Sequence, residues 1–148
     1  MSLPKTILVP VDFSEASERA LVYALDLAKS TGGTVHVMHA FELPIIGFPD
    51  GTLVATAEMA AKIVDSAQSS LSALVAKYES TSVPLTAALK QADPRAAILA
   101  VAKELDAELV VMGTHGRRGL AHALIGSVAE SVVRTSTIPV LTLREPKR

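Results

Sequence analysis

Glycines near the carboxyl-terminal end of the chain have the spacing of a phosphate-binding loop. They follow the apolar run Leu109–Met112, and they are Gly113, Gly116 and Gly126, with Ser127 directly after the last. Because glycine has no Cβ atom, backbone N–H groups at these positions can approach a phosphate closely. A helix that opens at Ser127 would add free N–H donors and a partial positive charge. The segment therefore predicts a phosphate site, with an ordinary glycine-rich turn as the alternative.

The loop differs from two familiar phosphate motifs. It lacks the Gly-Lys-Ser/Thr of a Walker A loop, and it is not Gly-x-Gly-x-x-Gly. Inside the loop, His115 could donate a hydrogen bond to a phosphate oxygen, or it could face solvent. Arg117 and Arg118 could pair with a β- or γ-phosphate, or they could be ordinary surface arginines.

A single carboxylate, Asp12, follows the first apolar run of the chain. It could accept hydrogen bonds from ribose hydroxyls or adenine N–H groups. Alternatively, it could be a helix N-terminal carboxylate that backbone donors satisfy. It is also the evident candidate to reach Mg²⁺, through water, because no carboxylate cluster is clearly placed to hold a metal. His36 and His39 point to opposite faces of one strand, so we expect no shared metal there.

Composition narrows the class of protein. Of the 148 residues, 49% are hydrophobic and 20% are charged, so the chain can bury a core, which excludes a disordered protein. The absence of cysteine excludes disulfides, thiolate metal sites and cysteine nucleophiles. A net charge of −1 predicts no broad attraction to nucleic acid or to a membrane surface. We expect one domain over residues 1–148, in the cytoplasm, because no apolar run is long enough to span a membrane.

Short β-branched runs alternate with longer alanine-rich stretches. The runs predict strands at Thr6–Val11, Thr34–Phe41, Val83–Leu89, Leu109–Met112 and Ile138–Leu143. The stretches between them predict four helices: one whose face combines Ala20, Tyr23, Ala24, Leu27 and Ala28, then Thr56–Tyr78, Pro94–Leu105 and Ser127–Thr135. Continuous apolar strands joined by helices indicate an α/β fold. It would be an open parallel sheet with helices on both faces.

Local signals set the boundaries of these elements. Ser14 can cap the first helix, and Gly32-Gly33 can close it. Asp93-Pro94 combines a capping residue with proline at the first helical position. Ser127 and Glu130 have the spacing of a capping box, which predicts Ser127 as the cap. The segment Glu42–Ala55 is rich in glycine and proline, and we interpret it as a flexible loop, with a lid or a partner surface as alternatives.

Four separated motifs, in this order, resemble the universal stress protein family. They are Val9-Pro10-Val11-Asp12-Phe13-Ser14, Asp93-Pro94, Gly113-x2-Gly116-x9-Gly126-Ser127 and Ile138-Pro139-Val140, and together they span almost the whole chain. The resemblance implies a five-stranded parallel sheet with strand order 3-2-1-4-5. The glycine pattern is that of the members that bind ATP. One departure is Ala92, where the family often has glycine, so the turn before Asp93 could differ.

The same resemblance implies a set of binding residues. Asp12 would contact the nucleoside beside Pro10 and Val11, while Ala40 and Met112 would lie near the adenine. The phosphates would be held largely through backbone N–H groups of Gly113, Gly116, Gly126, Ser127 and Val128. His115 and Arg117 complete the candidate site.

Three functions are compatible with these residues. The first is an ATP-binding regulatory module, in which nucleotide orders loops and changes a dimer or partner surface. The second is a slow ATPase or phosphotransferase, and the third is an interaction protein that does not use nucleotide. The candidate catalytic groups are few, so we expect binding rather than catalysis. The apolar last strand, Ile138–Leu143, predicts a homodimer formed along a sheet edge.

Overall fold

Five parallel strands form the central sheet of the computed structural model, which describes residues 2–44, 46–51, 53–54, 56–114 and 125–144. The strands are β1 (Thr6–Pro10), β2 (Thr34–Phe41), β5 (Leu85–Gln91), β6 (Leu109–Gly113) and β7 (Val140–Leu143). Their order in the sheet is β5-β2-β1-β6-β7, and every pairing is parallel. Counted along the chain, these five strands have the order 3-2-1-4-5, which confirms the predicted fold.

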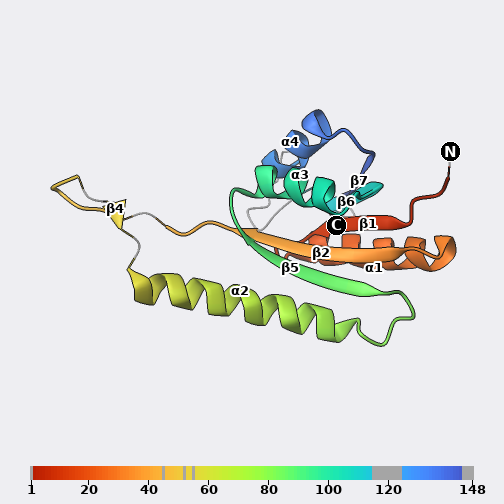
Figure 1. The fold of residues 1–148 in the computed structure, drawn as a ribbon, viewed down its shortest axis with the longest axis horizontal. Coiled ribbons are helices and arrows are strands. Elements are labelled where there is room, and N and C mark those ends of the chain that lie inside the picture. Colours follow the sequence, from red (N-terminus) through yellow and green to blue (C-terminus); the bar gives the residue numbers. More distant parts are fainter. Residues whose placement is uncertain (1, 45, 52, 55, 115–124, 145–148) are drawn as a thin grey trace.

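Helices cover both faces of the sheet (Figure 1). The helices are α1 (Glu15–Thr31), α2 (Ala57–Lys77), α3 (Pro94–Glu104) and α4 (Ser127–Thr135). Helices α1 and α2 pack on one face, and α3 and α4 pack on the other, where they also contact each other. This arrangement follows from the right-handed crossovers that parallel strands require.

Alternation along β1 divides the core into two layers. Ile7 and Val9 face α1 and α2, whereas Leu8 faces α3 and α4, and all three side chains are fully buried. This is why the strand reads as a continuous apolar run rather than an alternating one. Burial of each such side chain contributes about 1.5–3 kcal/mol.

Tyr23 does not lie on the buried face of α1, contrary to the prediction from spacing. Its side chain is 45% exposed, while Ala20, Leu21, Ala24 and Leu25 are buried. The small alanines let the helix approach the sheet closely, and the two leucines then complete the contact. Tyr23 falls on the flank of that face and reaches solvent.

The segment after β2, which the sequence predicts to be a flexible loop, contains a short hairpin. Strand β3 (Ile46–Gly47) pairs antiparallel with β4 (Leu53–Val54). The turn is closed by the Gly51 N–H, which donates to the Phe48 carbonyl at 2.9 Å, and Gly51 has φ +87°. Figure 1 shows this hairpin far from the sheet, on the arm between β2 and α2. The Phe48 side chain is 47% exposed.

The predicted capping signals on α1 and α3 are confirmed. The Ser14 hydroxyl accepts from Ser17 N–H, and Gly32 ends α1 with φ +71°. Asp93 caps α3 in the same way, and Pro94 is its first residue. Ala92 is not among the described residues with positive φ, and its N–H donates to the Phe41 carbonyl at 3.0 Å. This turn therefore accommodates alanine without backbone strain.

Gly33 joins α1 to β2 at a very close approach between backbones. A Cβ atom added there would lie 2.5 Å from the Lys5 carbonyl oxygen, whereas one added at Gly32 would meet nothing within 4 Å. We predict that Gly33→Ala destabilises the protein by about 1–3 kcal/mol because the backbone must shift. Gly32→Ala should cost only about 1 kcal/mol, from torsional strain. Urea unfolding of both variants measures the difference, and equal losses would contradict the steric argument.

Glu18 on α1 anchors the end of α2. Its carboxylate accepts hydrogen bonds from Lys77 Nζ and, at 2.7 Å, from the Tyr78 hydroxyl. The Lys77 ammonium, and after it the Tyr78 hydroxyl, lower the pKa of Glu18 below its ordinary value of 4.5. The carboxylate thus contributes stability above pH 4.5, and that contribution is lost as the pH falls through the lowered pKa of the folded state.

We therefore predict that Glu18→Gln lowers the melting temperature at pH 7, and that the difference from the wild type narrows below pH 4.5. Glu58→Gln is the matched control, because the Glu58–Lys62 pair is largely exposed and should contribute little at any pH. Thermal unfolding from neutral to acidic pH tests this. A Glu18→Gln difference that does not change with pH would exclude the ionic interaction as its cause.

Candidate functional site

The carboxyl ends of β2, β1 and β6 lie side by side at one edge of the sheet. Pro10 is level with Met38, and the ladder continues with the Val11 N–H, which donates to the Met38 carbonyl at 2.8 Å. On the other side, Leu8 is level with Val110. Extending these registers brings Asp12 between Ala40 and the end of β6. The strand order reverses between β1 and β6, because β2 and β5 follow on one side of β1 whereas β6 and β7 lie on the other. Open α/β sheets bind ligands at such a switch point.

Two of the candidate residues are buried in the core. The side chains of Val11 and Met112 are each only 5% exposed, and they pack into opposite layers. Pro10 and Ala40 are half-buried at the same edge. The residues around the strand ends therefore offer a ligand mainly backbone atoms and a small apolar surface.

Asp12 lies at the amino-terminal end of α1. Its Oδ1 accepts the Ser14 N–H at 3.0 Å, and its own N–H donates to Ser17 Oγ at 3.3 Å. A backbone donor therefore satisfies the Asp12 carboxylate, as in the alternative that the sequence allowed. The bond from Ser14 fixes the direction of the carboxylate, which is compatible with a role as a ligand.

Phe13 and His39 border Asp12, in an arrangement that the sequence pattern did not predict. Phe13 has φ +65°, and its ring centroid lies 4.5 Å from that of His39. His39 Nδ1 lies 2.7 Å from the Val11 carbonyl oxygen. The position of His39 along its strand predicted only that its side chain lies on the opposite face from that of His36. No sequence signal could have indicated a positive φ at a phenylalanine.

Gly113 has a packing role that is independent of any ligand. A Cβ atom there would lie 2.9 Å from Ala16 Cβ and 3.0 Å from the Ala16 carbonyl carbon. The end of β6 therefore packs directly on the first turn of α1. Thr114, which sequence reasoning passed over, is 3% exposed, and its N–H donates to the Leu143 carbonyl at 3.0 Å. This bond ties the start of the glycine-rich loop to β7.

The amino-terminal end of α4 differs from the prediction of a capping box. Gly126 is the capping residue, and Ser127 is the first helical residue, exposed to solvent. Gly126 occupies the extended conformation that a cap requires, with φ −72° and ψ 160°, so Ser127 is already inside the helix. Glu130 bonds to Arg134 in the next turn.

Among the described residues, no side chain caps α4, and the Gly126 N–H donates to the Thr114 carbonyl. The helix terminus is thereby held next to the end of β6. Val128, in the first turn, is half-buried. The first-turn N–H groups and the positive end of the helix dipole are suited to an anionic group.

Three candidate residues, His115, Gly116 and Arg117, lie outside the described residues. In the part of the chain that the structure describes, no three His, Cys, Asp or Glu side chains are grouped so as to hold a metal ion. Within the same residues, no helix is both long and apolar enough to cross a membrane.

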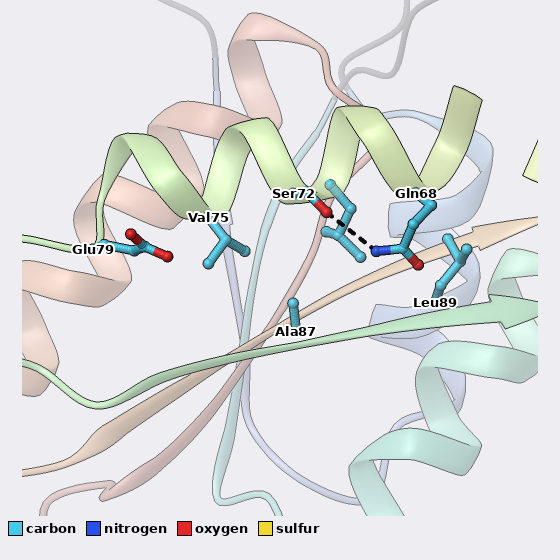
Figure 2. Close-up of a pocket in the computed structure, with 7 residues that line it drawn as sticks. Gln68, Ser72, Val75, Glu79, Ala87 and Leu89 are labelled. Carbon is cyan, nitrogen blue, oxygen red and sulfur yellow. Dashed lines mark hydrogen bonds between the residues drawn. The ribbon is translucent and has the colours of Figure 1, made fainter. Parts of the chain in front are cut away.

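A separate depression lies between α2 and β5 (Figure 2). It has a volume of about 230 Å³, and its lining comes from Gln68, Leu71, Ser72, Val75, Glu79, Ala87 and Leu89. Gln68 Nε2 donates to Ser72 Oγ at 3.2 Å along the helix. The depression contains none of the candidate residues, and it lies on the side of β5 rather than at the switch point between β1 and β6.

Known proteins resemble this chain over nearly its full length. The Universal stress protein MJ0531 of Methanocaldococcus jannaschii is 30% identical, over 99% of this chain and 86% of that protein. The solved structure of MJ0577, from the same organism, has a TM-score of 0.82 at 22% identity and covers 99% of both chains. A universal stress protein of Archaeoglobus fulgidus, solved in complex with dAMP, has a TM-score of 0.67 at 26% identity, over 95% of this chain and 98% of that one.

The sequence profile of the Universal stress protein family matches residues 4–144. The strand order and the motifs at the strand ends agree with this match. The chain belongs to the universal stress protein family.

Proposed function

We propose that this protein binds an adenine nucleotide at the carboxyl ends of β1, β2 and β6, as one binding unit spanning residues 1–148. The observation that carries the proposal is the position of the amino-terminal end of α4, which the bond from Gly126 to Thr114 holds next to the end of β6. The relative from Archaeoglobus fulgidus that was solved with dAMP supports the choice of an adenine nucleotide.

The nucleoside would lie over the end of β1. Asp12 is directed by its bond to Ser14 N–H, and a carboxylate at this position can accept hydrogen bonds from ribose hydroxyls. Ala40 and Pro10 would provide apolar contact for the base beside it. These side chains are small and half-buried, so part of each is accessible to a ligand at the edge of the sheet.

The phosphates would lie at the start of α4. The N–H groups of Ser127 and Val128 begin the helix, and the helix dipole adds a partial positive charge. In the proposed site, Gly116, His115 and Arg117 complete the phosphate loop, and ATP is the preferred ligand, with Mg²⁺ bound to its phosphates. Binding would then order this loop and change the surface that partners meet.

A second copy of the chain is the partner that the edge of the sheet favours. Strand β7 is at the edge of the sheet. The carbonyls of Pro139, just before β7, and of Leu143 accept bonds from the N–H groups of Val110 and Thr114, at 3.0 Å each. Because backbone groups alternate in direction along a strand, those of Val140 and Thr142 point away from β6. We propose that these outward groups pair with the same strand of a second copy.

The phosphate site is tested by adding a negative charge where a phosphate would bind. We expect Ser127→Asp to weaken AMP and ATP binding by about tenfold or more, while adenosine binding stays unchanged. The helix itself should not lose stability, because an acidic residue is favourable in a first turn. Isothermal titration with the three ligands, together with thermal unfolding, measures both effects.

Ser131→Asp is the matched control, because it adds the same charge one turn further along α4. Gly113 is unsuitable as a probe, since any larger residue there would clash with Ala16. If Ser127→Asp leaves AMP affinity intact, the start of α4 is not the phosphate site. If the wild type binds no adenine nucleotide at millimolar concentration, the proposed function is wrong.

The dimer is tested on the outward side of β7. Thr142→Pro removes one outward N–H and no donor of the ladder to β6, so we expect dissociation with little loss of fold. Thr142→Ser keeps the backbone donor and should remain dimeric. Sedimentation velocity at micromolar concentration, with circular dichroism as a check on folding, distinguishes the two. A wild type that sediments as a monomer would overturn the proposal.

A further inference from the structure

We propose that His39 is a positioning residue of the nucleotide site: it holds the strained turn at Phe13 and thereby directs the Asp12 carboxylate. The proposal rests on the proposed function, because the site it serves is the adenine-nucleotide site. His39 does not itself bind the nucleotide in this proposal. It acts through the two residues on either side of Asp12.

The turn that follows β1 has an unusual backbone conformation. Phe13 has φ +65°, a left-handed conformation that is uncommon for a bulky aromatic residue. Such conformations persist only where the surrounding structure enforces them, and they are concentrated at functional sites. Some contact must therefore hold Phe13 in place, and that contact must lie beside Asp12.

His39 supplies that contact on both sides of Asp12. Its Nδ1 lies 2.7 Å from the Val11 carbonyl oxygen, and because a carbonyl can only accept, Nδ1 carries the proton. Its ring packs on Phe13 with the centroids 4.5 Å apart and the planes tilted by 45°, a favourable geometry for two aromatic rings. One side chain from β2 thus holds the residue before Asp12 and the residue after it.

The contacts of His39 with Val11 and Phe13, which we call the clamp, determine where the Asp12 carboxylate points. The Asp12–Phe13 peptide is planar, so a change in φ at Phe13 would rotate the chain that leads to Ser14. The Ser14 N–H is the donor to Asp12 Oδ1, at 3.0 Å. If Phe13 relaxed to a negative φ, this bond would be lost, and the carboxylate would no longer be held towards the edge of the sheet.

Two substitutions distinguish the effect of the His39 hydrogen bond from the effect of the size of its side chain. His39→Leu keeps an apolar side chain of similar size but cannot donate to Val11. His39→Asn places an amide donor near the position of Nδ1 and serves as the conservative rescue. We expect His39→Leu to weaken AMP binding about five- to tenfold in isothermal titration. His39→Asn should recover most of that loss.

A double-mutant cycle with Asp12→Ala distinguishes positioning from general destabilisation. If His39 acts through Asp12, His39→Leu has no further effect on AMP affinity once the carboxylate is absent. The same fold-loss in both backgrounds would overturn the proposal, as would an unchanged affinity in His39→Leu. Thermal unfolding of each variant verifies that the proteins compared are folded.

Amide hydrogen exchange of the protein without nucleotide provides a readout that is independent of binding. The Ser14 amide should exchange faster in His39→Leu than in the wild type, and His39→Asn should restore its protection. Unchanged exchange at Ser14 would refute the clamp. If the wild type instead binds no adenine nucleotide while this amide responds as expected, the proposed function fails and the clamp on Asp12 stands.

Discussion

The contact between Gly113 and Ala16 is the constraint on which the arrangement of the site depends. A Cβ atom at Gly113 would lie 2.9 Å from that of Ala16, so the end of β6 and the first turn of α1 meet with no side chain between them. Helix α1 begins only a few residues after Asp12, and the loop after β6 leads to α4. The contact therefore sets how far apart the carboxylate and the start of α4 lie.

Backbone groups, more than side chains, build the candidate site. The bonds from Thr114 to Leu143 and from Gly126 to Thr114 link β6, β7 and α4 through main-chain atoms alone. Val11 and Met112 direct their side chains into the core. Such a site is suited to holding an anionic ligand in a fixed position.

The sequence predicted the fold well because its signals are local or periodic. Continuous apolar runs identified the five main strands, and the capping residues Ser14 and Asp93 set the starts of two helices. Predictions that depended on how elements pack or begin were less accurate. Tyr23 had helical spacing but fell on the flank of the packed face. Ser127 had capping-box spacing, yet Gly126 occupies the cap, because spacing alone does not fix where the chain enters the helix.

By itself, then, the sequence determined the α/β class, the strand order through its family resemblance, and the residue types that meet at the carboxyl edge. Only the tertiary structure decided how those residues are held. The positive φ of Phe13 and its contact with His39 join residues 26 positions apart, and no local pattern records such a pairing. The requirement for glycine at position 113, which comes from its contact with Ala16, is likewise absent from any local pattern. Both depend on which surfaces touch after the sheet and its helices have packed, and that information lies in distances between elements, not in the order of residues along the chain.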